Sequence, residues 1–200
     1  MPVGGVGVFG GTFDPIHNGH LAVASEVAAR LDLAQVIFVP SGESWQKPGR
    51  VQATPEQRYE MALLATAPDP RFTVSRVDVE RAGPSYAIDT MTDLTTNLPG
   101  ISKWSFIIGA DAAANLATWH HIDELRKRCT FVAVTRPGHA LVSSVAVQEV
   151  PIPALDISST DIRRRVSERR QIRYLVPEPV RAYISKSALY RNPDGGSDEC

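Results

Sequence analysis

The 200-residue sequence has little cysteine, no long apolar run and no large excess of charge. Its two cysteines are Cys129, in an apolar run, and Cys200, the last residue. They make no disulfide framework, so a reducing, cytoplasmic location is expected. No apolar run approaches the length that crosses a bilayer, and the N-terminus lacks the basic and then apolar pattern of a secretion signal. We therefore expect no membrane partner.

The balance of charge also excludes a class of function. Lys and Arg number 21 against 22 Asp and Glu, which gives a formal net charge of −1. Bulk binding to nucleic acid depends on an excess of positive charge, so we expect no nucleic-acid partner. The length suits one domain, which we place at residues 1–191. Residues 192–200 are rich in Gly, Asp and Ser, which predicts a disordered tail.

Apolar runs alternate with helical patterns along the chain. Strands are expected at 6–10, 36–40, 72–79, 104–109, 130–134 and 147–152. Helices are expected from about 18 to 30, from a capping box at 54 to 65, and at 86–98, 111–116, 159–168 and 177–185. This alternation predicts an α/β fold: a single Rossmann-like domain whose mostly parallel sheet is flanked by helices, with further helices at the C-terminus. Ligands of such sheets bind beyond the carboxyl ends of the strands.

The segment between the first strand and the first helix reads V-F-G-G-T-F-D-P-I-H-N-G-H, residues 8–20. Gly10 and Gly11 lack Cβ and let the backbone approach a ligand closely. The following helix start offers unpaired N–H groups, which favour a phosphate. His17 and His20 are three positions apart, share a helix face and can donate to phosphate oxygens. There are two alternatives: an ordinary turn with solvated histidines, and a metal site formed by His17 and His20. The metal site would lack a nearby third ligand.

A second segment, I-S-S-T-D-I-R at residues 157–163, places three hydroxyls at a helix start. Ser158, Ser159 and Thr160 can cap the helix or bind phosphate, and Arg163 lies one turn further on. Taken alone, a plain cap with surface arginines would explain this segment as well. The arginines that follow are expected to form mostly a solvated face; they are Arg164, Arg165, Arg169, Arg170 and Arg173.

Both segments resemble signatures of the nucleotidyltransferase superfamily, G-T-F-D-P-x-H-x-G-H and I-S-S-T-x-x-R. Further blocks narrow the resemblance to bacterial nicotinate-nucleotide adenylyltransferases, and it spans about residues 6–190. These blocks are R-A-G-P-S-Y-A-I-D-T at 81–90, G-A-D-A at 109–112 with Trp119, R-P-G at 136–138, and Y-L-V-P at 174–177 with Val180, Tyr183 and Ile184.

The resemblance implies transfer of AMP from ATP to nicotinate mononucleotide, with pyrophosphate as the second product. Because the attacking phosphate oxygen is already ionised, no general base is needed, and Mg²⁺ would arrive with ATP rather than on a protein metal site. His17, His20 and Arg163 are then the catalytic residues. The residues expected to bind ATP are Gly10, Gly11, Thr12, Phe13, His17, His20, Ser158, Ser159, Thr160 and Arg163. Those expected to bind nicotinate mononucleotide are Lys47, Ser85, Tyr86, Asp111, Trp119 and Arg136.

Three departures from the family pattern concern the acceptor side. Ala87 replaces a usual threonine, Ser44-Trp45-Gln46-Lys47 replaces Pro-Pro-His-Lys, and Ile122 replaces an aromatic residue. Trp45 suggests a lid over the acceptor. Trp119 as plain core and Asp111 as a helix cap are the competing interpretations of those two residues. His120 and His121 are interpreted as surface or helix-start residues.

Three other functions compete with this interpretation. They are a phosphopantetheine adenylyltransferase, an enzyme that accepts nicotinamide mononucleotide, and a non-catalytic nucleotide- or RNA-binding module that uses the basic run at 163–173. The sequence does not determine the oligomeric state.

Overall fold

A six-stranded parallel sheet forms the centre of the computed structural model, which describes residues 4–43, 51–135, 141–153 and 155–192. The strands are β1 (Gly5–Gly11), β2 (Leu33–Pro40), β3 (Phe72–Val74), β4 (Trp104–Gly109), β5 (Thr130–Thr135) and β6 (Gln148–Pro151). Their order is β3-β2-β1-β4-β5-β6, so the chain winds outward from β1 to one edge and from β4 to the other. The reversal lies between β1 and β4, where ligands bind in open sheets of this kind.

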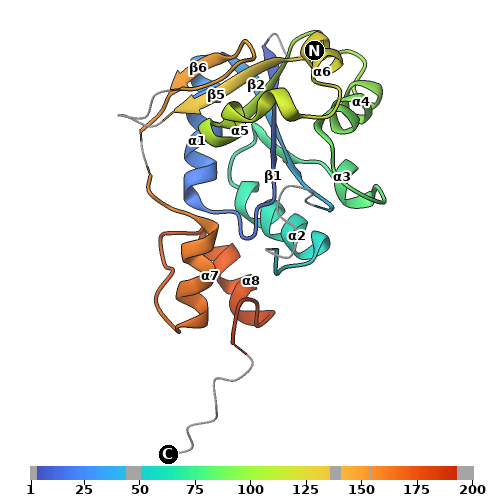
Figure 1. Cartoon of the computed structure of the whole chain (residues 1–200). Coiled ribbons are helices and arrows are strands. Elements are labelled where there is room, and N and C mark those ends of the chain that lie inside the picture. The colour runs from blue at the N-terminus through green and yellow to red at the C-terminus, as the bar shows by residue number, and fades with distance from the viewer. Residues whose placement is uncertain (1–3, 44–50, 136–140, 154, 193–200) are drawn as a thin grey trace, which may run out of the picture.

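Helices cover both faces of this sheet (Figure 1). They are α1 (Asn18–Arg30), α2 (Pro55–Thr66), α3 (Val77–Glu80), α4 (Ala87–Asn97), α5 (Ala110–Ala114), the 3-10 helix η1 (Leu116–Thr118), α6 (Ile122–Arg128), α7 (Ser159–Ser167) and α8 (Glu178–Lys186). Successive residues of β1 serve opposite faces, because side chains alternate along a strand. Phe9 packs in one apolar cluster with residues of α1 and α2, whereas Val8 packs in another with residues of α4 and α6. The expected α/β sheet with helices on both sides is confirmed.

Two parts of the sequence-based description are wrong. The strand expected at 72–79 ends at Val74, and the chain turns into α3. The buried carboxylate of Asp78 in α3 accepts hydrogen bonds from Thr90 of α4 and from Arg81, so the turn gives this charged group partners inside the protein. The helix α6 was not expected. It follows His121, whose φ of 49° lies in the left-handed region.

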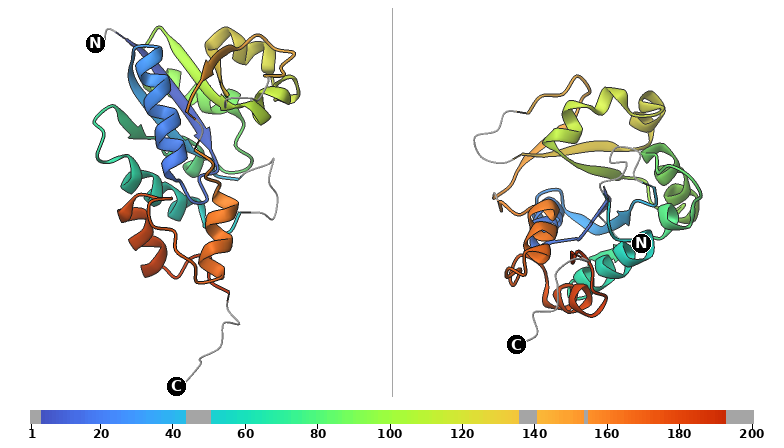
Figure 2. Two further views of the ribbon diagram at one scale, coloured as in Figure 1. Left: turned by 90° about the vertical axis from the view of Figure 1, so that its left-hand side faces the viewer. Right: turned by 60° about the horizontal axis from the view of Figure 1, so that its bottom comes forward.

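The two C-terminal helices lie beyond the carboxyl end of β1 rather than on a face of the sheet (Figures 1 and 2). Ile162 of α7 and Val180 and Ile184 of α8 join the apolar cluster that α1 and α2 form on the sheet. α8 packs against α2. The division at residue 191 stays a prediction, and residues 193–200 lie outside the described residues.

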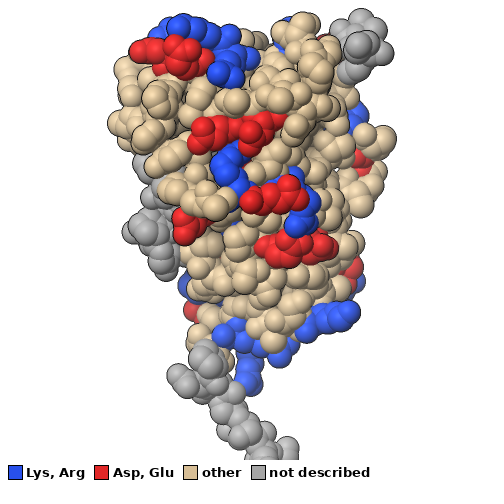
Figure 3. Space-filling view, turned by 90° about the vertical axis from the view of Figure 1, so that its right-hand side faces the viewer, with Lys and Arg blue, Asp and Glu red and all other residues tan. Residues whose placement is uncertain are grey.

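Charge is distributed unevenly over the molecule. On the face shown in Figure 3, red and blue alternate near the middle, while Lys and Arg gather at the lower end, where the C-terminal helices lie. Among the described residues, no helix has both the length and the apolar character needed to cross a bilayer.

Candidate active site

The segment after β1 makes a tight turn at the carboxyl end of the sheet. Phe13 has a φ of 51°, in the left-handed region, and its ring lies over Gly11. A Cβ on Gly11 would lie 2.8 Å from that ring, closer than van der Waals contact allows. The glycine is therefore required by the packing of the turn itself, whatever ligand the turn holds.

His17 and His20 meet at the start of α1. His17 is the N-cap and His20 is the third residue of the helix, and their rings stack with centroids 3.7 Å apart. The main-chain N–H of His17 donates to Nδ1 of His20 over 3.2 Å. Because Nδ1 accepts this bond, a proton carried by the His20 ring lies on Nε2. The two predicted phosphate ligands are thus brought together, as a cap and a first-turn residue.

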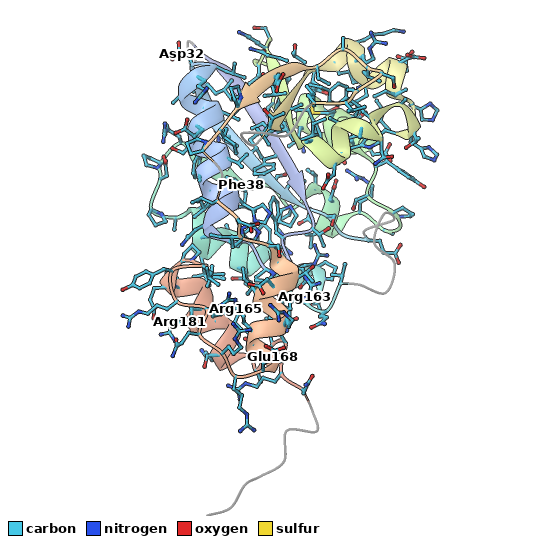
Figure 4. The ribbon with its side chains drawn as sticks, turned by 60° about the vertical axis from the view of Figure 1, so that its left-hand side comes forward. Asp32, Phe38, Arg163, Arg165, Glu168 and Arg181 are labelled. Carbon is cyan, nitrogen blue, oxygen red and sulfur yellow. The ribbon has the colours of Figure 1, made fainter. Side chains whose placement is uncertain are left out.

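The start of α7 docks on this turn from the other end of the sequence. Ser158 is the N-cap and accepts from the N–H of Asp161, while the hydroxyl of Ser159 donates to the carbonyl of Pro15 over 2.9 Å. Nη1 of Arg163 donates to the carbonyl of Asp14 over 2.7 Å. In Figure 4, Arg163 lies at the end of α7 nearest the sheet, and Glu168 lies at the far end. The two segments predicted to bind phosphate therefore lie in contact with each other.

The side chain of Arg58 in α2 binds the main chain of the turn and of the segments beside it. Its side chain donates to the carbonyls of Thr12 (2.7 Å) and Gly42 (2.8 Å), and also to that of Ala53 (3.3 Å). Only 1% of the residue is exposed, and this burial lowers the pKa of the Arg58 guanidinium. Sequence reasoning missed Arg58, because it occupies a core-facing position of a helix without any motif.

A pocket of about 240 Å³ opens between the carboxyl ends of β1 and β4. The ring of Tyr86, the N-cap of α4, lies 4.1 Å from that of His120, and Trp119 packs edge-on against Phe106. Within the described part of the chain, the indole N–H of Trp119 has no acceptor. The pocket also includes Gly10, Gly11, Thr12, Ser85, Ala87 and Gly109. Three flat rings beside an anion-binding turn suit an aromatic ring that carries a phosphate.

Comparison with known proteins agrees with this geometry. The model of the cytidylyltransferase-like family matches residues 8–165. A nicotinate-nucleotide adenylyltransferase of Acidothermus cellulolyticus is 52% identical over 200 residues, with 96% of each chain covered. One of Leifsonia xyli is 53% identical, with 94% of each chain covered. The chain belongs to the nicotinate-nucleotide adenylyltransferase family.

A solved structure supports the fold of this family member. The nicotinic acid mononucleotide adenylyltransferase of Plasmodium falciparum, in complex with NaAD, superposes with a TM-score of 0.76. It covers 94% of this chain and 97% of its own, at 18% sequence identity. This adenylyltransferase is therefore a nucleotidyltransferase enzyme with a Rossmann-like fold.

The other residues expected on the acceptor side of this adenylyltransferase have different positions. The hydroxyl of Ser85 lines the pocket and accepts from the N–H of Gly42 over 2.9 Å, so it also joins the loop after β2 to the segment before α4. Asp111 lies in the first turn of α5, exposed, and is not among the described residues that line the pocket. Its helix is capped by Gly109. Lys47, Arg136 and the lid residue Trp45 lie outside the described residues.

His120 was missed as a pocket residue. The expected surface positions hold for both histidines, which are exposed, and His121 is the N-cap of α6. His120 also lines the pocket, and its ring, tilted against that of Tyr86, joins two segments 34 positions apart. A signal was available in the sequence, since His120 directly follows Trp119.

A larger hollow of about 870 Å³ lies in the C-terminal part of the molecule, and we name it the C-terminal hollow. It is lined by Val166, Ser167, Arg169, Arg170, Gln171, Ile172, Arg181, Ile184, Ser185, Arg191 and Asn192. Two of its arginines are already paired with carboxylates, Arg170 with Glu168 and Arg181 with Glu178. The hollow contains no strand end, whereas the smaller pocket is lined by residues at the carboxyl ends of β1 and β4. We therefore take the smaller pocket, with the adjoining turn, as the candidate site.

The described charged side chains around the site are not arranged as a set of metal ligands. Among the described residues, no group of three or more His, Cys, Asp and Glu side chains is placed to hold a metal ion. Burial raises the pKa of the Cys129 thiol to about 12, so this cysteine stays a protonated core residue. The expectation that Mg²⁺ arrives with ATP stays a prediction.

Proposed function

We propose that this adenylyltransferase binds ATP between the turn after β1 and the start of α7, and nicotinate mononucleotide in the pocket between β1 and β4. The observation that carries the proposal is the meeting of the two segments: Ser159 and Arg163 donate to the carbonyls of Pro15 and Asp14, beside the stacked pair His17 and His20. Donors from two distant segments thereby surround a space next to a helix start that favours anions.

The reaction exchanges one phosphoanhydride bond for another. A phosphate oxygen of nicotinate mononucleotide attacks the α-phosphorus of ATP and forms the new P–O–P bond. The bond from that phosphorus to the oxygen that bridges to the β-phosphate breaks, and pyrophosphate leaves. The nucleophile is already ionised near neutral pH, so no side chain has to remove a proton.

The protein's contribution is to position the two substrates and to stabilise negative charge in the transition state. We assign the α- and β-phosphate oxygens to His17 and His20. Ser159, Thr160 and Arg163 hold the β- and γ-phosphates and the leaving pyrophosphate, with Ser158 as the cap that shapes their helix start. The backbone of Gly10, Gly11, Thr12 and Phe13 borders both nucleotides. Mg²⁺ carried with ATP would neutralise part of the charge of the triphosphate.

On the acceptor side, the pyridine ring is assigned to the rings of Trp119 and Tyr86, which line the pocket. His120 lies against Tyr86 and narrows the same space. Ser85 contributes by holding the loop after β2 in place. Asp111, Lys47 and Arg136 stay assigned to the ribose and phosphates of the acceptor on the resemblance alone.

The test is release of pyrophosphate from ATP·Mg²⁺ with four parallel acceptors: nicotinate mononucleotide, nicotinamide mononucleotide, phosphopantetheine and none. We expect release with nicotinate mononucleotide, and its loss in His20→Ala. A preference for phosphopantetheine would keep the mechanism and reject the substrate. ATP-independent RNA binding with a steep salt dependence, without release of pyrophosphate, would reject the enzyme in favour of a binding module.

A further inference from the structure

A buried carboxylate lies directly behind the phosphate-binding turn. Asp14 is 3% exposed, and its oxygens accept hydrogen bonds from the N–H groups of Gln52 (2.8 Å) and Ala53 (3.1 Å). A third donor comes from the far end of the chain. The hydroxyl of Tyr190 lies 2.8 Å from Oδ1 of Asp14, although the two residues are 176 positions apart.

The same residue that receives Tyr190 also receives Arg163. Nη1 of Arg163 donates to the main-chain carbonyl of Asp14 over 2.7 Å, and it lies 3.8 Å from Oδ2 of the same residue. The side chain of Arg163 is only 16% exposed, so its direction is set by these protein contacts rather than by solvent. Any shift of Asp14 therefore moves the acceptor that aims the Arg163 guanidinium.

Tyr190 is held tightly in its place beyond α8. The residue is 7% exposed and belongs to the apolar cluster shared by α1, α2 and α8. Its φ of 62° lies in the left-handed region, which a tyrosine adopts only when its surroundings require it. Burial, followed by the Asp14 carboxylate, raises the pKa of the Tyr190 hydroxyl well above its ordinary value. The hydroxyl thus stays protonated and remains a donor to Asp14.

We propose that Tyr190 is a positioning residue for adenylyl transfer: its hydroxyl holds Asp14, and Asp14 aims Arg163 at the phosphates of ATP. The inference rests on the proposed function, because it takes Arg163 as a ligand of ATP. Tyr190 touches neither substrate. Neither Asp14, Arg163 nor Tyr190 is among the described residues that line the pocket assigned to nicotinate mononucleotide, so we expect its affinity not to depend on this contact.

The test is the substitution Tyr190→Phe, which removes one oxygen and keeps the ring in the core. We expect the KM for ATP to rise about tenfold, because a hydrogen bond to a charged group is lost. The KM for nicotinate mononucleotide stays within about twofold. A purely structural loss would instead raise the KM values for both substrates alike. Tyr174→Phe is the matched control, because Tyr174 is 79% exposed, and it leaves both KM values unchanged.

A second variant makes the result independent of how well Tyr190→Phe folds. Asp14→Asn keeps the Tyr190 hydroxyl but removes the negative charge of the carboxylate to which that hydroxyl donates. It gives an ATP-selective loss of the same kind, and combining it with Tyr190→Phe adds less than the product of the two single losses. The rise in Tm caused by ATP·Mg²⁺, measured without acceptor, shrinks in both variants relative to the wild type.

Two results would overturn the inference while the proposed function stands: a wild-type KM for ATP in Tyr190→Phe, or an equal rise in both KM values. Independent, fully multiplicative losses in the double variant would also overturn it. Failure of the proposed function gives a different pattern. The wild-type chain would then form no dinucleotide product from ATP and nicotinate mononucleotide.

Discussion

The sheet region, residues 4–153, and the C-terminal unit, residues 158–192, differ in their apolar and charged composition. The sheet region has an apolar cluster on each face, and β1 carries five buried residues in succession. α7 buries Ile162, and most of its other side chains are polar or charged. Residues 158–192 contain nine Lys and Arg against three Asp and Glu, whereas residues 4–153 contain 12 against 15. The sheet region supplies most of the apolar frame, and the C-terminal unit adds positive charge while completing one apolar cluster with residues such as Ile162 and Val180.

This difference explains how the site is assembled. The sheet region fixes the turn after β1 through close packing and the buried Arg58. The C-terminal unit reaches the turn with a few specific contacts, from Ser159, Arg163 and Tyr190 to Pro15 and Asp14. The proposed triphosphate site is thus divided between a preformed half in the sheet region and a docked half in the C-terminal unit. The following predictions test that division, from the largest effect to the smallest.

His20→Ala removes the donor of the sheet region and is expected to lower kcat by about 10³-fold, the upper range for losing one transition-state donor. The expected reason is lost stabilisation of charge at the α-phosphate. His121→Asn is the control, since His121 caps α6 and asparagine tolerates its left-handed backbone. The measurement is the initial rate of pyrophosphate release at saturating substrates. Equal rates in both variants would remove His20 from the catalytic set.

Arg58→Met tests the frame itself. It leaves the carbonyls of Thr12, Gly42 and Ala53 without their buried donor, and we expect the free energy of unfolding to fall by about 3 kcal/mol. Arg76→Met, at an exposed arginine paired with Glu56 and Glu80, should cost less than about 1 kcal/mol. Urea unfolding of both variants measures the contrast. Similar losses would show that burial does not distinguish the two arginines.

Arg163→Ala removes the cation that the docked half brings to ATP. We expect kcat/KM for ATP to fall by about 10²-fold, because a charge-assisted contact to phosphate is lost. Arg165→Ala is the matched control on the same helix. Arg165 pairs with Asp161 over 2.6 Å and should leave kcat/KM within about twofold. Steady-state kinetics with varied ATP decide between them, and an equal loss in both variants would mean that only net charge matters.

His120→Ala tests the acceptor pocket of the sheet region. Loss of the ring stacked on Tyr86 is expected to raise the KM for nicotinate mononucleotide about fivefold, the scale of one aromatic contact. The KM for ATP should change by less than about twofold, because His120 lies away from α7. If the KM for ATP rises instead, the assignment of the pocket to the acceptor is wrong.

The smallest effect concerns the exposed ion pairs of the C-terminal unit. Hydrogen bonds from Arg165 and Arg164 lower the pKa of Asp161 below its ordinary value of 3.8. A lowered acid pKa stabilises the fold above that ordinary value, and the contribution disappears as the pH falls through the folded-state pKa. Tm differences between wild type and Asp161→Asn should therefore be small and constant from pH 5 to 8, and vanish near pH 2. A difference that grows on acidification would contradict this assignment.

Much of the fold could be predicted from the sequence, because buried parallel strands read as short apolar runs such as Val36–Pro40. The strand predicted at 72–79 is too long, because an alternation of polar and apolar residues carries no information about the burial of Asp78. The seven-residue helix α6 has too few apolar residues for a clear period.

The site could be predicted where it is written in contiguous motifs. His20 and Arg163 come from two such motifs, and the structure brings their segments together. Arg58 and Tyr190 could not be predicted, because their contacts join residues 46 and 176 positions apart and leave no local signal. The roles of the site residues in the reaction stay predictions.

A crystal structure with a non-hydrolysable ATP analogue and Mg²⁺ tests the division of the site most directly. The account predicts phosphate oxygens within about 3.2 Å of both Nε2 of His20 and the guanidinium of Arg163, so that one triphosphate bridges the two regions. Phosphates seated in the C-terminal hollow, among Arg169, Arg170, Arg181 and Arg191 and away from His20, would contradict it.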